Sequence, residues 1–322
     1  MTIRRHMESS GQSGCITVIG SFVTDLVITS AEFVKEGETI LGDSFHQYPG
    51  GKGVNQAVAA ARLGGRVSMI GKLGNDAFGR QQVETMEANG VNHEHVLFTD
   101  EAPSGVGNPQ IDSHGRNRIV VIPGANMTFT SAEVEELRSV IAGSDIIVLQ
   151  LEIPIDTVYA AIRIAHDLGR TVILNPAPAA VVSQAYAPMV DWLVPNQHEA
   201  ELLTGVEVND VGSAREAATI LSAAGYRNIL ITLGEQGAYL RAVDGTETVS
   251  EAFRMEQVVD TVAAGDSYIG ALAYGLSNGW EPARCMRYAS AASALAVTRP
   301  GAIPSLPSRD EVDEFLRSRC AD

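Results

Sequence analysis

The residues best placed to do chemistry lie in the segment Asp260-Thr-Val-Ala-Ala-Gly-Asp266. The small side chains of Ala263, Ala264 and Gly265 leave backbone N–H groups uncovered where a helix is predicted to begin. Free amides and the positive end of a helix dipole at one point favour an anion such as a phosphate. A carboxylate at that point, Asp266, is unfavourable unless it has a task, for example removing the proton of a hydroxyl that attacks a phosphate. The alternative is that Asp266 only caps the helix.

A second glycine-rich element, Pro49-Gly-Gly-Lys-Gly-Val-Asn-Gln56, also precedes a predicted helix. It is not a Walker A loop, because Lys52 is followed by Gly53 rather than by Ser or Thr, and it has no dinucleotide-binding glycine pattern. Glycines let the backbone approach a ligand closely, and Lys52 and Asn55 offer hydrogen-bond donors suited to sugar hydroxyls. Taken alone, the element is also compatible with ordinary turn chemistry before a helix.

Further polar residues follow predicted buried strands. Glu152 comes after the apolar run at residues 146–149, so we expect it at the carboxyl end of a strand. Asn196 and Glu199 open a predicted helix, where Glu199 either holds Mg²⁺ through water or completes a capping box with Asn196. The segment Thr232-Leu-Gly-Glu-Gln-Gly237 either wraps a nucleotide or is a hairpin turn.

The scaffold for these residues is predicted by short Val- and Ile-rich runs that alternate with amphipathic stretches. This alternation indicates an α/β fold with a mostly parallel central sheet flanked by helices, and with ligand sites beyond the carboxyl ends of the strands. The predicted strands are Cys15–Gly20, Arg66–Gly71, Asp145–Leu149, Thr171–Asn175, Trp192–Pro195 and Asn228–Leu233. The predicted helices are Gly53–Leu63, Phe78–Asn89, Ser131–Ala142, Ile155–Leu168, Ser213–Ala224, Gly265–Asn278, Pro282–Val297 and Arg309–Arg317.

Two segments, at about residues 25–48 and 104–122, interrupt this alternation with strand-like pieces and turn residues. We predict that they form a small antiparallel flap at one edge of the main sheet, which would help to exclude water from a reaction. The alternative is a pair of ordinary surface hairpins. Pro109 cannot donate to a strand ladder, so the strand that contains it is expected at an edge or with a bulge.

Composition narrows the classes of protein. The chain has 322 residues, 45% of them hydrophobic and 19% charged, and no apolar run long enough to cross a bilayer. Its net charge of −16 argues against a nucleic-acid partner. The first residues carry no apolar stretch of a secretory signal, so we expect a cytoplasmic protein with a disordered leader at 1–14 and one domain at 15–322.

Eight short motifs of the chain match one family pattern: Gly20-Ser21 with Asp25, Gly50–Gln56, Leu149-Gln-Leu-Glu152, Asn175-Pro-Ala-Pro178, Pro195–Glu199, Thr232–Gly237, Asp260–Asp266 and Val297-Thr-Arg-Pro-Gly301. With them the chain, from about Ile16 to Leu316, resembles the ribokinase-like (pfkB) family of carbohydrate kinases, and within it the pentose-kinase branch. The resemblance implies a three-layer fold with a small β-sheet lid, a homodimer formed through that lid, and transfer of the ATP γ-phosphate to a sugar hydroxyl, O5 in D-ribose.

The resemblance also implies a role for individual residues. Asp266 would be the catalytic base, and the N–H groups of Ala263, Ala264 and Gly265 would form an anion hole. The sugar would be held by Asp25, Gly51, Lys52, Asn55, Glu152 and Asp266. ATP would contact Asn196, Thr232, Leu233, Gly234, Glu235, Gln236, Gly237 and Gly265. Glu199 would organise Mg²⁺, and an activating K⁺ would be bound by the side chains of Asp260 and Ser305 and the carbonyls of Val262, Ala296, Arg299 and Gly301.

The chain departs from the family pattern in the part that is expected to cover the sugar. Val23 stands where many ribokinases have an Asn that contacts the sugar, and an apolar side chain cannot hydrogen-bond a hydroxyl. The segment Gly20–Val27 is similar to that of 2-deoxyribose kinases. A kinase for 2-deoxyribose or another small sugar is therefore the alternative to a ribose kinase, and a sugar-sensing protein without catalysis is a more remote one.

Overall fold

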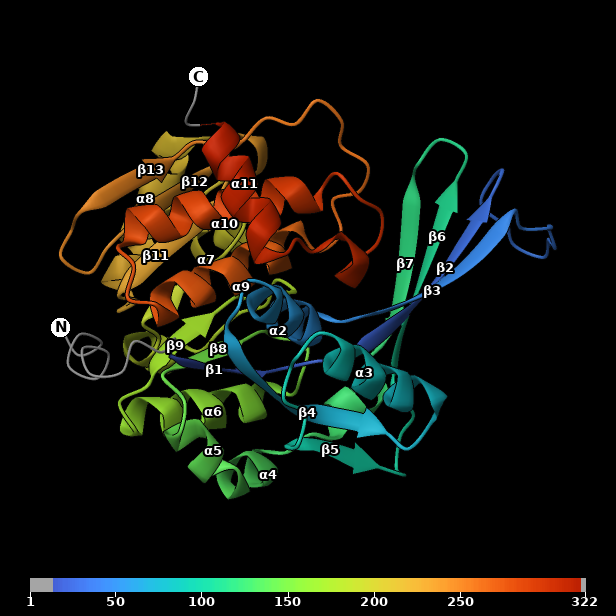
Figure 1. Cartoon of the computed structure of the whole chain (residues 1–322), viewed down its shortest axis with the longest axis horizontal. Helices are drawn as coiled ribbons and strands as arrows, with labels where there is room; N and C mark the ends of the chain where they lie inside the picture. Colours follow the sequence, from blue (N-terminus) through green and yellow to red (C-terminus); the bar gives the residue numbers. More distant parts are fainter. Residues whose placement is uncertain (1–13, 320–322) are drawn as a thin grey trace.

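The computed structural model describes residues 14–319, so the predicted leader, apart from Gly14, lies outside the described residues. In this part of the chain nine strands form one sheet in the order β13-β12-β11-β10-β9-β8-β1-β4-β5 (Figure 1). All neighbours pair in parallel except β11 with β12 and β12 with β13. The strands are β1 Cys15–Ile19, β4 Arg66–Gly74, β5 Val96–Thr99, β8 Ile146–Leu149, β9 Thr171–Leu174, β10 Trp192–Leu193, β11 Asn228–Thr232, β12 Ala238–Arg241 and β13 Glu247–Ser250.

Helices cover both faces of this sheet, which confirms the predicted three-layer α/β fold. Buried side chains of α2, α9, α10 and α11 pack in one apolar cluster, and those of α4, α5, α6 and α8 in another. The helices are α2 Lys52–Arg62, α3 Ala77–Ala88, α4 Ser131–Glu136, α5 Arg138–Ala142, α6 Ile155–Asp167, α7 Gln197–Thr204, α8 Val211–Ala223, α9 Ala264–Ser277, α10 Pro282–Ala296 and α11 Arg309–Ser318. Short 3₁₀ helices are η1 Gly124–Thr128, η2 Gln184–Met189, η3 Gly234–Gln236 and η4 Ile303–Ser305.

One predicted helix is wrong in part. The amphipathic stretch Ser131–Ala142 is two short helices, α4 and α5, because the backbone of Leu137 (φ −89°, ψ 12°) leaves the α-helical geometry. Its N–H reaches back three residues to the carbonyl of Val134, as in a 3₁₀ turn. Periodicity shows which side chains face the core, and both short helices keep that face, so the break is invisible in the pattern.

The two segments that interrupt the alternation form a separate four-stranded sheet, which projects from the main body as an arm in Figure 1. We call it the lid. Its strands, in the order β3-β2-β6-β7, are β3 Ser44–Gly50, β2 Val23–Ser30, β6 Gly105–Asp112 and β7 Asn117–Ile122. The prediction of an antiparallel flap is wrong, because β2 and β6, which are far apart in sequence, pair in parallel at the centre of a mixed sheet.

Pro109 was expected at an edge or with a bulge, and it lies in β6, an inner strand of the lid. The ladder between β2 and β6 is interrupted there: pairing stops after Asp25 with Gly107 and resumes at Ile28. The side chain of Asn108 donates to the carbonyl of Leu26 at 2.9 Å and so satisfies a backbone group within the gap. A neighbouring amide side chain thus lets a proline occupy an inner strand.

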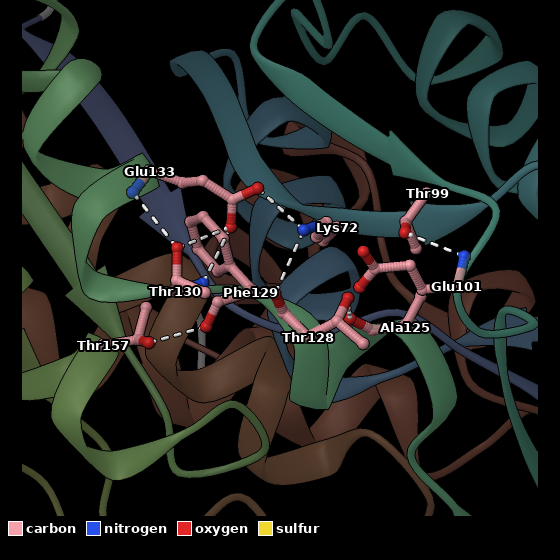
Figure 2. Close-up of polar contacts among 9 residues, drawn as sticks. All are labelled: Lys72, Thr99, Glu101, Ala125, Thr128, Phe129, Thr130, Glu133 and Thr157. Carbon is pink, nitrogen blue, oxygen red and sulfur yellow. Dashed lines mark hydrogen bonds and ion pairs between the residues drawn. The ribbon is translucent and has the colours of Figure 1, made fainter.

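An ion pair between the buried Lys72 and the partly exposed Glu133 fixes the segment that follows the lid to the main sheet (Figure 2). Lys72, on β4, donates to the Glu133 carboxylate at 2.7 Å and to the carbonyl of Thr128 at 3.0 Å. Burial opposes the charged form of Glu133, but its hydrogen bonds with Lys72 and Thr130 hold the pKa of its carboxyl below the usual value. Thr157 of α6 binds the carbonyl of Phe129 in the same cluster, so β4, η1, α4 and α6 are tied together.

No helix within residues 14–319 is long and apolar enough to span a membrane.

Candidate active site

A pocket of about 220 Å³, open to solvent, lies where β9, β10 and β11 end and where α2, α7 and α9 begin. This is the edge of the sheet at which the sequence predicted a ligand site. The pocket is lined by Lys52, Asn175, Ala177, Val194, Asn196, Glu199, Thr232, Thr261, Ala263, Gly265, Asp266 and Ile269.

Asp266 lies in the first turn of α9 and is only 7% exposed. The helix begins after Ala263, whose φ of 60° is the only positive value at a non-glycine residue in the described chain. Two neighbouring side chains of α2 hold the carboxylate: Asn55 donates to Oδ2 and Gln56 to Oδ1, each at 2.9 Å. The carboxylate is therefore fixed at both oxygens on the wall of the pocket. Its side chain makes no capping bond to α9, so the simple capping alternative is not what the structure has.

The two helices approach each other so closely because of Gly270, one turn beyond Asp266 on α9. A Cβ at this position would lie 2.5 Å from the Cβ of Ala59 and 2.8 Å from the carbonyl oxygen of Gln56. Real Cβ atoms do not come that close to other heavy atoms, so only glycine permits this contact. The close approach brings Asn55 and Gln56 within reach of Asp266.

The amides at the start of α9 are suited to an anion. Among the residues the structure describes, the N–H groups of Ala263, Gly265 and Asp266 have no hydrogen-bond partner. A Cβ at Gly265 would meet nothing within 4 Å, so this backbone is open to the pocket. The N–H of Ala264 donates to the carbonyl of Thr261 at 3.3 Å, so the predicted set of three amides is only partly free, and the amide of Asp266 itself is an addition that the sequence analysis missed.

Lys52 supplies the positive charge of the pocket. Burial disfavours its ammonium group, but the charges of Asp266, Glu152 and Glu199 outweigh that effect and raise the pKa of Lys52. The side chain therefore remains protonated in a mostly acidic protein. An ammonium group among three carboxylates also reduces their mutual repulsion, and it offers three donors to a bound phosphate or hydroxyl.

Glu152 closes the junction between the lid and the main body. Its Oε2 accepts from the hydroxyl of Ser21 at 2.5 Å and from the backbone N–H of Lys52 at 3.0 Å. Gly51, which precedes Lys52, has a φ of 103°, and a Cβ there would lie 2.6 Å from the backbone nitrogen of Val23. These contacts bring the glycine-rich segment and the start of β2 together, although Glu152 and Gly51 do not line the pocket itself.

Asp25, on β2 of the lid, is mostly buried. Burial, together with the nearby charge of Glu152, raises the pKa of its carboxyl to about 6. A side chain at Gly107, its ladder partner on β6, would collide with the carboxylate, so the glycine makes room for it. The structure thus places Asp25 near Glu152, at the base of the lid rather than in the wall of the pocket.

Asn196 and Glu199 form the predicted capping box at the start of α7. The backbone N–H of Glu199 donates to Asn196 Oδ1 at 2.8 Å, and Glu199 Oε2 accepts from the backbone N–H of Asn196 at 2.9 Å. Both residues also line the pocket, so capping does not remove them from it. Burial raises the pKa of the Glu199 carboxyl, while the N–H of Asn196 and the charge of Lys52 partly oppose this shift.

The Thr232–Gly237 segment is the turn between the antiparallel strands β11 and β12, so the hairpin interpretation is correct. Thr232 lines the pocket, whereas Leu233 is buried and residues 234–237 form the turn and its exit. The N–H of Leu233 donates to the carbonyl of Gly237 and closes the turn at 2.8 Å. A contact of this turn with a nucleotide remains a prediction.

Asp260 connects the two loops to which the predicted K⁺ ligands belong. Its carboxylate accepts from the N–H groups of Val262 at 2.9 Å and Gly301 at 3.0 Å. Ser305 is fully buried and donates to the carbonyl of Ala302 at 2.7 Å. Within residues 14–319 no group of three or more His, Cys, Asp and Glu side chains is arranged to hold a metal ion, and a site made of carbonyls, one hydroxyl and one carboxylate is a different type.

The sequence analysis missed three amide side chains of this site. Gln56 and Asn175 belong to motifs that it noted, but it gave them no role, and the same holds for Gln150. The polar pair Asn55-Gln56 in a helix that is otherwise apolar from Val54 to Ala60 was the available signal, because every residue from Gly53 to Ala60 is buried. Buried amides need partners. Gln56 donates to Asp266, Asn175 faces Glu199, and Gln150 donates to Gln56.

Comparisons with known proteins agree with this geometry. Residues 15–309 match the family model described as "pfkB family carbohydrate kinase". The chain is 38% identical over 301 residues to a ribokinase of Haemophilus influenzae, covering 94% of this chain and 98% of the relative. It is 37% identical over 302 residues to a deoxyribokinase of Salmonella typhimurium, with the same coverage. A structure of Arabidopsis thaliana ribokinase complexed with ribose and ATP superposes with a TM-score of 0.91 at 29% identity, covering 95% of this chain and 99% of that one.

Proposed function

The chain belongs to the pfkB family of ATP-dependent carbohydrate kinases, and from that premise we propose that it is a ribokinase, which phosphorylates D-ribose at O5 with Asp266 as the general base. One observation carries the proposal. A buried carboxylate, held at both oxygens by neutral amides, lies beside three unpaired backbone amides, those of Ala263, Gly265 and Asp266, at a helix N-terminus in an open pocket.

The chemistry follows from this arrangement. The sugar hydroxyl gives its proton to the Asp266 carboxylate while its oxygen forms a bond to the γ-phosphorus of ATP. The bond from that phosphorus to the β–γ bridging oxygen breaks, and ADP leaves. The amides of Gly265 and Asp266, together with the helix dipole, stabilise the charge on the phosphoryl oxygens, and Lys52 adds a positive charge. The side chains of Asn55 and Gln56 hold both oxygens of this carboxylate in place at the wall of the pocket.

Two cations fit the residues present. Mg²⁺ uses one or two carboxylates together with waters and phosphates, and the buried Glu199 carboxylate on the pocket wall suits that mode. When bound, Mg²⁺ neutralises phosphate charge. K⁺ would be held by the oxygens of Asp260, Ser305 and the loop carbonyls, where Asp260 already bonds both loops. By ordering the loop before α9, K⁺ would keep the amides of the anion site in place.

The sugar is either ribose or 2-deoxyribose. Relatives that are 38% and 37% identical carry the names ribokinase and deoxyribokinase, so identity does not separate the two. Val23, which is buried at the start of β2 next to Gly107, favours the second candidate because it cannot bind a hydroxyl. We keep ribose as the proposal, since Asp25 and Asn55 still offer polar groups near this position.

A panel of ribose, 2-deoxyribose and fructose, followed by ADP release at low sugar concentration, tests the assignment. A ribokinase gives the highest kcat/KM with ribose. If 2-deoxyribose is preferred, the variant Val23→Asn should shift the preference toward ribose, and an unchanged preference would show that position 23 does not set it. ADP release with none of these sugars would contradict the pentose-kinase proposal.

We also propose a homodimer through the lid. The side chains of Ile119, Val120, Val121 and Ile122 on the edge strand β7 are all more than half exposed, and they occupy both faces of the lid. One face can cover the sugar, and the other would bury its apolar side chains against a second lid. Analytical ultracentrifugation of the protein and of the variant Val120→Lys tests this, with a dimer expected for the first and a weaker one for the second.

A further inference from the structure

Gln56 is a buried glutamine, 1% exposed, in the second turn of α2. It does not line the pocket, and yet its side chain bonds directly to a residue that does. Its Nε2 donates to Asp266 Oδ1 at 2.9 Å and to Asn175 Oδ1 at 3.1 Å, and its Oε1 accepts from Gln150 Nε2 at 2.7 Å. All three partners come from other elements of the fold.

These three bonds allow only one orientation of the carboxamide. Both acceptors, a carboxylate oxygen and an amide oxygen, require N–H groups, and Gln150 offers an N–H that requires an oxygen. Gln150 is fully buried and so cannot turn toward solvent. The Asn175 amide is fixed in turn, because its Nδ2 donates to the carbonyl of Val194 at 3.0 Å and faces Glu199 Oε2 at 3.5 Å.

The result is a bridge of neutral amides between two carboxylates of the pocket. It runs from Asp266 through Gln56 and Asn175 to Glu199, and Gln150 locks it from behind. The other charged groups that act on the two carboxylates are Lys52 and, on Glu199, His198. From the side of α2, Asp266 therefore faces the charge of Lys52 and two neutral donors, Asn55 and Gln56, and it is these two donors that fix the plane of its carboxylate relative to the pocket.

We propose that Gln56 is a positioning residue of the kinase reaction: it holds the Asp266 carboxylate in the orientation in which its remaining lone pairs face the sugar hydroxyl, and it links that orientation to Glu199 through Asn175. The proposal rests on the proposed function, in which Asp266 is the base. Gln56 itself contacts neither substrate. Its effect therefore falls on the proton-transfer step rather than on binding, because positioning a base within a fraction of an ångström changes the rate of a reaction more than the affinity for its substrates.

The helix contact alone does not account for these bonds. α2 and α9 are joined by backbone packing at Gly270 and by apolar side chains, and a Met or Leu at position 56 would serve that packing equally well. A glutamine is needed only if an N–H must reach Asp266 and an oxygen must meet Gln150.

The test compares Gln56→Met, which keeps the length of the side chain and removes its hydrogen bonds, with the wild-type enzyme and with Asp266→Asn. We expect Gln56→Met to lower kcat by about 10- to 100-fold, with KM for sugar and for MgATP changed by less than about threefold. The acidic limb of its kcat–pH profile should lie at higher pH, because a carboxylate that has lost an N–H donor takes up a proton more easily.

Two further variants keep the test decisive if Gln56→Met folds poorly. Gln150→Met leaves the bond from Gln56 to Asp266 in place but removes the donor that holds the Gln56 oxygen. Its kcat–pH profile should therefore shift in the same direction as that of Gln56→Met, but by a smaller amount. Gln82→Met is the matched control: Gln82 is also 1% exposed, but it bonds to the lid backbone at Val23 and Gly50, and its profile should keep the wild-type position.

A wild-type pH profile for both Gln56→Met and Gln150→Met, with Asp266→Asn inactive, would overturn the role of Gln56 and leave the proposed function intact. Near-normal turnover of Asp266→Asn would instead remove the base, and the inference about Gln56 with it.

Discussion

The close approach of α2 and α9 gives a prediction that separates stability from activity. In Gly270→Ala the new Cβ would meet the Cβ of Ala59 at 2.5 Å, and it would also meet two backbone atoms of α2. Backbone cannot swing aside as a side chain can, so the helices must move apart by about 1 Å to restore an ordinary contact. The hydrogen bonds from Asn55 and Gln56 to Asp266, now 2.9 Å, would lengthen beyond a useful distance.

The magnitude follows from two opposing effects. Overpacking costs roughly 1 to 3 kcal/mol, and replacing a helical glycine by alanine returns about 1 kcal/mol. The free energy of unfolding should therefore fall by about 0 to 2 kcal/mol, which lowers Tm by a few degrees at most for a chain of this size. A displacement of about 1 Å at a catalytic group, by contrast, can lower kcat about 100-fold. We expect a protein that is folded and close to inactive.

Gly265→Ala is the control, because it makes the same chemical change one turn earlier in α9. A Cβ at Gly265 meets nothing within 4 Å, so Tm should be unchanged or slightly raised. Its methyl group would enter the space beside the free amides, so KM for ATP should rise. Differential scanning calorimetry gives Tm for both variants. Coupled ADP assays give kcat for Gly270→Ala and KM for ATP for Gly265→Ala. Wild-type kcat in Gly270→Ala would refute the view that the helix contact positions Asp266.

Three further predictions concern charge. The pKa of Asp25 is raised to about 6, so Asp25 loses the negative charge that accepts sugar hydroxyls as pH decreases through 6, and kcat/KM for the sugar should fall. This inflection should be absent in Asp25→Asn. An inflection that remains in that variant would belong to another group. Replacing K⁺ by a large organic cation should lower turnover if Asp260 belongs to a cation site, and unchanged activity would remove that site from the account. Lys72→Met removes the charged partner of the Glu133 carboxylate, which is partly exposed and keeps its bonds from Thr130, so Tm should fall by a few degrees at most with little change in KM; an unchanged Tm would show that the pair contributes nothing.

The sequence was sufficient for six of the nine strands described in the main sheet and for most helices, because buried parallel strands and amphipathic helices have strong patterns; the strands β5, β12 and β13, which lie toward the two edges of the sheet, were not predicted. It was not sufficient where a partner distant in sequence decides the structure. The parallel pairing of β2 with β6 depends on how two separate segments meet, and Pro109 is tolerated on an inner strand because Asn108 bonds to Leu26. Neither fact can be read from local propensity.

In the candidate site, too, some residues could be identified from the sequence, and others only from their contacts in the structure. Asp266 and Glu199 were found because each stands in the first turn of a predicted helix, a position that polar chemistry favours; the strand-like approach expected before Asp266 at Gln257–Val259 is not a strand in the structure. Gln56 and Asn175 have no such signature, since an amide inside a helix or after a strand is usually only a satisfied polar group. Their meaning appears only when the bonds to the pocket carboxylates are seen. Gly270 likewise becomes informative only beside α2.

Turnover by Asp266→Asn tests the central claim most directly. The side chain keeps its size but cannot take up a proton, so kcat should fall by about 10²- to 10⁴-fold, whereas ATP, titrated calorimetrically, should bind with nearly wild-type affinity. A variant that turns over sugar at close to the wild-type rate would contradict the assignment of Asp266 as the base.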